Sequence, residues 1–190
     1  MKGSTVFAQF MARPMLSSKW WMTDNNLDNK MYTIAVFLDL SKAFDTVNRE
    51  ILVKKMERLG FRGMIFNWFT DYLSDRKMCV DVGGNVSSVR SVNIGLPQGS
   101  VTSPYCFSLY LNDMHRSSSK FRFVHFADDT TLYMSGHNLK DLCQEVNQEL
   151  DKVSMWLRTN RLSLNVGKTS FMLFTHAHMN NIPDTIHIND

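Results

Sequence analysis

Apolar residues fall along the chain in runs that predict β-strands. The longest run, TIAVFLDL at residues 33–40, is almost unbroken and includes one acidic residue, Asp39, near its end. Such a run is typical of a strand that is covered on both faces. Shorter apolar or alternating runs predict further strands at residues 78–82, 86–92, 121–126, 130–134, 162–166 and 171–175. Only Gly83-Gly84-Asn85 separates one pair of these runs and only Ala127-Asp128-Asp129 another, which predicts two hairpins.

Apolar residues at three- and four-residue steps predict helices between the strands. The clearest such pattern covers residues 139–157. A second helix is expected to begin at an N-cap, Asn48, and to stop at Gly60. Others are predicted at residues 5–21, with a kink or end at Pro14, and at 64–73 and 104–115. This order of elements predicts an α+β fold, with helices packed on one face of a mostly antiparallel sheet.

Composition limits the class of protein. The chain has 190 residues, of which 44% are hydrophobic and 21% charged, as expected for a globular domain with a real core. Its net charge of +3 is compatible with a nucleic-acid partner without establishing one. Its three cysteines form no C-x-x-C pair, which excludes a zinc ribbon and predicts reduced thiols. With no run of membrane-span length and no signal-peptide core, we expect an intracellular protein of the cytoplasm or nucleus, not secreted and without a membrane partner.

Three carboxylates fall at the ends of predicted apolar strands. Asp39 ends one strand, and Asp128 and Asp129 lie at a hairpin tip. If these strands are neighbours, the three like charges meet at one sheet edge, which is costly unless a cation lies among them. Magnesium prefers oxygen ligands, and a pair of such ions can clamp a phosphoryl displacement. From spacing alone an alternative stays open, in which Asp39 is a cap or loop residue and the pair a solvated turn.

Four segments in order resemble the motifs of one family. FLDLSKAFDTVNREIL (37–52) resembles motif A of the reverse transcriptases of non-LTR (LINE-like) retrotransposons. IGLPQGSVTSPYCFSLYLNDM (94–114), FADDTTLY (126–133) and LSLNVGKTSFMLF (162–174) resemble motifs B, C and D. The resemblance covers roughly residues 30–175, with suitable gaps between the motifs. It implies a polymerase palm, in which an antiparallel sheet has helices packed on one face.

The resemblance also implies an activity and a metal site. The activity is that of an RNA-directed DNA polymerase, with an RNA template, a DNA primer and deoxynucleoside triphosphates as partners. Two Mg²⁺ ions, or Mn²⁺ in their place, would be held by Asp39, Asp128, Asp129 and the backbone carbonyl of Leu40.

Further residues take implied roles at the nucleotide. Phe44 corresponds to an aromatic gate against the ribose hydroxyl, with a core phenylalanine as the alternative. Gln98 and Gly99 correspond to a nucleotide-binding loop, with an ordinary turn as the alternative. Lys168 corresponds to a lysine that gives a proton to pyrophosphate, with a surface lysine as the alternative. Asp45 is interpreted as a structural turn or cap residue before the next helix.

The resemblance predicts an incomplete polymerase. Residues 1–30 are expected to be a remnant of the fingers with a connecting helix, residues 31–176 the palm, and residues 177–190 a polar tail. The rest of the fingers and the thumb are expected to be missing. An alternative function therefore stays open, a catalytically inactive transposon-derived fragment that binds nucleic acid or protein at most.

Overall fold

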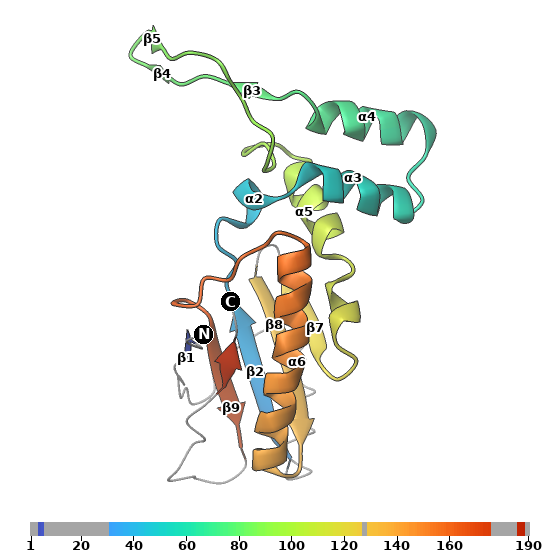
Figure 1. Ribbon diagram of the computed structural model, residues 1–190, viewed down its shortest axis with the longest axis vertical. Coiled ribbons are helices and arrows are strands. Elements are labelled where there is room, and N and C mark those ends of the chain that lie inside the picture. The colour runs from blue at the N-terminus through green and yellow to red at the C-terminus, as the bar shows by residue number, and fades with distance from the viewer. Residues whose placement is uncertain (1–3, 6–30, 127–128, 176–185, 189–190) are drawn as a thin grey trace. The chain divides into compact units, whose positions relative to one another are not determined.

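The computed structural model describes residues 4–5, 31–126, 129–175 and 186–188 (Figure 1). The chain divides into two compact units. The sheet unit contains Met1–Ser41, Asp113–Thr159 and Ser163–Asp190, and the helical unit contains Lys42–Asn112 and Asn160–Leu162. Each unit has its own arrangement of elements.

A four-stranded antiparallel sheet forms the centre of the sheet unit. Its strand order is β7-β8-β2-β9. The strands are β7 (Arg122–Phe126), β8 (Asp129–Gly136), β2 (Tyr32–Leu38) and β9 (Ser170–Phe174). As its apolar run predicted, β2 is covered on both faces, because its consecutive residues Ile34, Ala35 and Val36 are all 1% exposed or less. The antiparallel α+β class is therefore confirmed.

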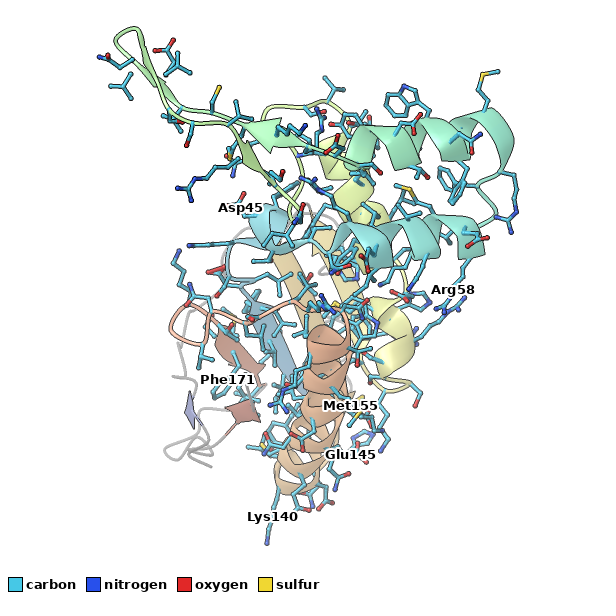
Figure 2. All side chains as sticks on the ribbon, turned by 45° about the horizontal axis from the view of Figure 1, so that its top comes forward. Asp45, Arg58, Lys140, Glu145, Met155 and Phe171 are labelled. Carbon is cyan, nitrogen blue, oxygen red and sulfur yellow. The ribbon has the colours of Figure 1, made fainter. Side chains whose placement is uncertain are left out.

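Helix α6 (Leu139–Thr159) packs against β2 and β8 along the sheet (Figure 1). Its predicted apolar side is buried, including Val146 and Leu150 at 0% exposure, while Lys140 and Met155 are exposed (Figure 2). Each large aliphatic side chain buried in this way contributes about 1.5–3 kcal/mol. Helix α6 thus fixes the sheet through a continuous apolar face. In the part of the chain that the structure describes, no helix is both long and apolar enough to cross a membrane.

The two ends of the described chain pair with each other in the sheet unit. Strand β1 (Ser4–Thr5) lies antiparallel to β10 (His187–Ile188), and Ile186 is only 1% exposed. The predicted polar tail at residues 177–190 thus includes one buried apolar side chain, that of Ile186. The predicted helix at 5–21 lies outside the described residues, except for Thr5, which is in β1. The domain boundaries at residues 30 and 176 stay predictions.

Three principal helices make up most of the helical unit, with the short helix α2 before them. The four are α2 (Ala43–Thr46), α3 (Arg49–Arg58), α4 (Gly63–Leu73) and α5 (Ser103–Leu111). The predicted N-cap is confirmed, since the Asn48 side chain accepts a hydrogen bond from the Ile51 backbone N–H at 3.0 Å. Helix α5 ends earlier than predicted, and a 3₁₀ turn of the sheet unit, η1 (Met114–Ser117), follows it.

A hairpin extends from the helical unit after α4 (Figure 1). Strands β3 (Lys77–Met78) and β6 (Arg90–Ser91) pair at its base, and β4 (Asp81–Val82) and β5 (Asn85–Val86) pair near its tip. The turn is tighter than predicted, because Gly83 and Gly84 alone form it with φ of 59° and 87°. Every residue from 77 to 91 is exposed. Much of the predicted apolar side of α4 is also exposed to solvent, and the Ile65 side chain, for example, is 61% exposed.

Candidate active site

Two of the three predicted carboxylates lie at the ends of neighbouring strands. Strands β2 and β8 pair as far as Leu38 opposite Thr130. Asp39 directly follows Leu38 and Asp129 directly precedes Thr130, so the two carboxylates belong to adjacent ends of neighbouring strands. Both side chains reach solvent. The third carboxylate, Asp128, lies outside the described residues.

Residues 163–165, which follow α6, are hydrogen-bonded through their backbone to residues 39–41, which follow β2. The Asn165 N–H donates to the Asp39 carbonyl at 2.8 Å, and the Ser41 N–H donates to the Ser163 carbonyl at 2.8 Å. These two bonds flank the bridge between Leu40 and Leu164. In such a non-hydrogen-bonded pair, the carbonyl of Leu40 is directed away from Leu164. This direction is compatible with the predicted ligand role of Leu40, which stays a prediction.

The same segment sets Lys168 beside the first carboxylate. Its Nζ is 3.9 Å from Oδ2 of Asp39, and the two side chains are 74% and 37% exposed. The Asp39 backbone N–H also donates to Thr169 Oγ1 at 3.3 Å. Because the ion pair is long and open to water, it adds little to stability. Its importance is electrostatic, as it places one positive charge among the carboxylates.

The part of the chain described by the structure contains no cluster of three or more acidic, histidine or cysteine side chains suited to a metal ion. Two of the four predicted ligand residues, Asp39 and Asp129, offer carboxylate oxygens on adjacent strand ends. Oxygen ligands of this kind suit Mg²⁺, which commonly needs only one or two protein carboxylates beside phosphates and water. The donor set therefore fits the predicted metal chemically.

The predicted nucleotide-binding residues of the helical unit line a common cavity. This Phe44 cavity has a volume of about 430 Å³ and is lined by Phe44, Gln98, Gly99, Ser100, Val101, Ser103 and Pro104. One face of the Phe44 ring stacks on Phe107, with centroids 4.8 Å apart and Phe107 1% exposed. Phe44 can therefore pack in the core and line the cavity at the same time.

The loop that contains Gln98 is pressed against the turn that contains Phe44. The Leu96 N–H donates to the Phe44 carbonyl at 2.8 Å, and the Gly95 N–H donates to the Val47 carbonyl at 2.8 Å. Gly95 has a φ of 80°, and a Cβ on it would lie 2.7 Å from the Asp45 carbonyl oxygen. This glycine therefore allows the close approach of the chain's own backbone.

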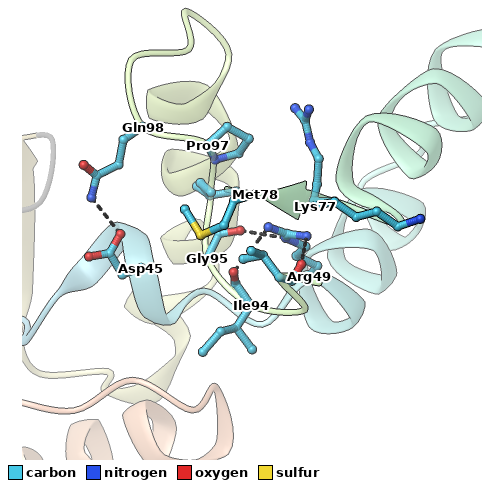
Figure 3. Close-up of a pocket in the computed structure, with 11 residues that line it drawn as sticks. Asp45, Arg49, Lys77, Met78, Ile94, Gly95, Pro97 and Gln98 are labelled. Atoms are coloured by element: carbon cyan, nitrogen blue, oxygen red, sulfur yellow. Dashed lines mark hydrogen bonds between the residues drawn. The ribbon is translucent and has the colours of Figure 1, made fainter. Parts of the chain in front are cut away.

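Arg49 is a residue whose role the sequence did not reveal. Basic residues are frequent between Lys42 and Arg62, and this stretch alone favours a solvated helix face. Arg49 is instead 9% exposed, and its guanidinium donates to four backbone carbonyls at 2.6–3.2 Å. One belongs to Leu73, and the other three belong to Val92, Ile94 and Gly95, which line the same cavity as Arg49 (Figure 3). Burial, followed by repulsion from Arg76, lowers the pKa of Arg49 from its ordinary value. No local sequence signal distinguishes Arg49 from its exposed neighbours.

Asp45 has a different partner from the one expected. The N-caps of α2 and α3 are Lys42 and Asn48, so Asp45 caps neither helix. Its Oδ1 accepts a hydrogen bond from Gln98 Nε2 at 2.7 Å (Figure 3). Asp45 is therefore not a cap residue; it lies in the single turn of α2, and its side chain bridges 53 positions to the motif B loop.

The structure thus forms two groups of predicted site residues. Asp39, Asp129 and Lys168 gather in the sheet unit, and Phe44 and Gln98 line one cavity in the helical unit, together with Gly99.

Comparisons with known proteins agree with this fold. The family model described as "Reverse transcriptase (RNA-dependent DNA polymerase)" matches residues 4–187. A solved telomerase of Candida tropicalis, truncated of its C-terminal domain, has a TM-score of 0.61 and 14% identity, covering 86% of this chain and 35% of that one. A Candida albicans telomerase in complex with an RNA fragment has a TM-score of 0.55 and 18% identity, covering 78% and 29%. At these identities the structures show the fold alone.

Similar sequences come from mobile elements. A probable RNA-directed DNA polymerase from transposon BS of Drosophila melanogaster is 30% identical over 155 residues, which cover 78% of this chain and 17% of the relative. The polymerase from mobile element jockey of the same species is 27% identical, covering 79% and 17%. A polyprotein from type-1 retrotransposable element R2 of Popillia japonica is 28% identical, covering 78% and 22%. The chain spans about a fifth or less of these relatives. With a family model matching nearly its whole length, the chain belongs to the reverse transcriptases, and its resemblance to the non-LTR branch is confirmed.

Proposed function

We propose that this chain is the palm of an RNA-directed DNA polymerase, working within a longer protein of a retrotransposon. The observation that supports this most directly is the pairing of β2 with β8 up to Leu38 and Thr130, which brings Asp39 and Asp129 to adjacent strand ends, with Asp128 next to Asp129 in the chain. The reaction is the attack of a primer 3′-hydroxyl on the α-phosphate of a deoxynucleoside triphosphate. An RNA template and a DNA primer are the proposed nucleic-acid partners, in the cytoplasm or the nucleus.

Reverse transcriptases use divalent metal ions. The proposed ligands here are Asp39, Asp128, Asp129 and the carbonyl of Leu40, for two Mg²⁺ or Mn²⁺ ions. Bound there, such ions would offset the charge of the reacting phosphates and favour an ionised primer hydroxyl. The chain itself contributes the rigid strand ends that hold the carboxylates together. Positioning of this kind supplies much of the rate of phosphoryl transfer.

Three further side chains have proposed roles at the nucleotide. Lys168, beside Asp39, gives a proton to the departing pyrophosphate. Phe44, stacked on Phe107, excludes a ribose 2′-hydroxyl by its bulk. Gln98, on the wall of the same cavity as Phe44, binds the sugar of the incoming nucleotide with Gly99 beside it.

The test is primer extension on an RNA template. The chain is expressed with flanking segments of the kind that its longer relatives contain. Asp39→Asn and Asp128→Ala are each expected to reduce extension by about 10³-fold, because each removes a carboxylate that would hold a metal ion. Asp71→Ala is the matched control, since Asp71 is an exposed carboxylate of α4. Extension retained by Asp128→Ala would remove Asp128 from the site.

A fragment that binds without catalysis is the second candidate. The net charge of +3 is compatible with this candidate, because a positive balance favours nucleic acid. Binding of a primer–template duplex that weakens with salt, without any extension in the extended protein, would favour this candidate. Extension that depends on Mg²⁺ and on both aspartates would exclude it.

A further inference from the structure

The hydrogen bond between Asp45 and Gln98 fixes which end of an amide is offered to a ligand. Gln98 Nε2 lies 2.7 Å from Asp45 Oδ1 (Figure 3). A side-chain amide has a donor end and an acceptor end, and the two can exchange by a half turn. An ionised carboxylate only accepts hydrogen bonds, so the NH₂ end must face Asp45. The carbonyl oxygen of Gln98 is then the end that remains for another molecule.

We propose that Asp45 is a positioning residue, which orients the Gln98 amide so that its oxygen accepts a hydrogen bond from a hydroxyl donor of the incoming nucleotide's sugar. This inference rests on the proposed function, because the nucleotide belongs to it. It adds a residue that acts only through Gln98. It also assigns a polarity to the interaction, in which the protein accepts and the ligand donates.

The backbone around this pair makes the orientation persistent. Both side chains are exposed, and an exposed pair alone is worth little because two flexible side chains must be ordered. Here the loop and the turn that present them are already fixed. Gly95 is packed against the Asp45 carbonyl, and the Leu96 N–H donates to the Phe44 carbonyl. Only side-chain torsions remain to be ordered when the bond forms.

The guanidinium of Arg49 adds a second support on the other side of the loop. It donates to the carbonyls of Ile94 and Gly95, directly before the segment that leads to Gln98. Arg49 and Asp45 also line a cavity of about 570 Å³, here called the Arg49 cavity. Gln98 lines this cavity and the Phe44 cavity. Gln98 thus borders both cavities, and its bond to Asp45 determines which end of the amide remains free.

The first test is a set of kinetic measurements in the extended protein. Asp45→Ala is expected to raise the KM for deoxynucleotides about five- to tenfold with a smaller change in kcat, as for the loss of one ordinary hydrogen bond. Discrimination between deoxynucleotides and 2′,3′-dideoxynucleotides should fall, because the amide oxygen is no longer held where the sugar hydroxyl can donate to it. Asp71→Ala should leave both quantities unchanged.

Double variants separate positioning from a general structural role. If Asp45 acts through Gln98, Asp45→Ala should have no further effect in a Gln98→Ala background. Gln98→Glu sets two carboxylates against each other and should be strongly impaired. Adding Asp45→Asn should restore much of the loss, since the asparagine NH₂ can donate to the glutamate. Effects of Asp45→Ala and Gln98→Ala that multiply, or a Gln98→Glu defect that Asp45→Asn does not relieve, would overturn the proposal.

A second measurement does not depend on activity. In the 190-residue chain, labelled with ¹⁵N, the side-chain amide of Gln98 is assigned by its loss in Gln98→Ala. Its proton resonance should be shifted from that of a free glutamine and return towards it in Asp45→Ala, but not in Asp71→Ala. An unshifted resonance in the unaltered chain would refute the positioning role. A shifted resonance in a protein that extends no primer would reject the polymerase proposal and leave the Asp45–Gln98 pairing standing.

Discussion

Replacing Arg49 by methionine is expected to destabilise the helical unit strongly. The guanidinium is almost fully buried and joins α3 to the end of α4 and to the loop before motif B. Methionine has a similar reach and fills similar space, but it donates no hydrogen bond. The substitution therefore removes the bonds and leaves the packing largely unchanged.

The size of the loss follows from the four carbonyl partners. The bonds to Leu73 and Gly95 are buried, whereas those to Val92 and Ile94 are partly open, so water can replace them. A buried carbonyl left without a partner costs about 1–3 kcal/mol. Two such carbonyls give a loss of about 3 kcal/mol for Arg49→Met, against a typical domain stability of about 5–15 kcal/mol.

Urea unfolding followed by circular dichroism measures this loss. Arg49→Lys should be intermediate, because a single ammonium reaches fewer of the carbonyls than the guanidinium does. Arg58→Met is the matched control, because Arg58 is an exposed residue at the end of the same helix, and the expected change is within about 0.5 kcal/mol. Amide exchange at Gly95 and Leu96 should also accelerate in Arg49→Met. The reasoning fails if Arg49→Met unfolds at the same urea concentration as the unaltered chain.

Three further predictions concern other positions. Gly95→Ala should lower the free energy of unfolding in urea by about 2 kcal/mol more than Gly99→Ala does. The two glycines have similar φ values, 80° and 77°, but only a Cβ on Gly95 would collide with backbone atoms. Equal losses in the two variants would contradict this. Cys79 is exposed and should be alkylated by iodoacetamide in the native protein, whereas burial raises the pKa of Cys106 to about 11 and should delay its modification until unfolding, as mass spectrometry would show. Asn48→Ala should lower the unfolding free energy by about 1 kcal/mol through loss of the N-cap, and an unchanged denaturation midpoint would argue against that role.

Local patterns were sufficient for the four-stranded sheet and the helix α6 of the sheet unit. The run at 33–40 predicted β2, and the spacing of apolar residues at 139–157 predicted α6, because periodicity directly reflects which faces are covered. The neighbourhood of Asp39 and Asp129 could also be predicted, since both flank apolar strands that had to be paired. For Asp128 the geometry stays a prediction.

Interactions between distant segments could not be predicted in the same way. Arg49 and Lys55 occur in a basic stretch, yet both are buried, because carbonyls contributed by other segments accept their hydrogen bonds. Asp45 and Gln98 are likewise joined only by the folding of two loops. The pattern of α4 predicted an apolar side but could not show that Ile65 remains exposed.

The way in which Lys168 is held has a consequence for charge at the site. Backbone bonds of Asn165 and Ser163 with Asp39 and Ser41 fix the segment, while the lysine side chain itself is mostly in water. The ammonium group can therefore swing out when another cation approaches Asp39, without loosening the strand end. Neutralising it, as in Lys168→Met, would change the local potential and leave the main chain in place.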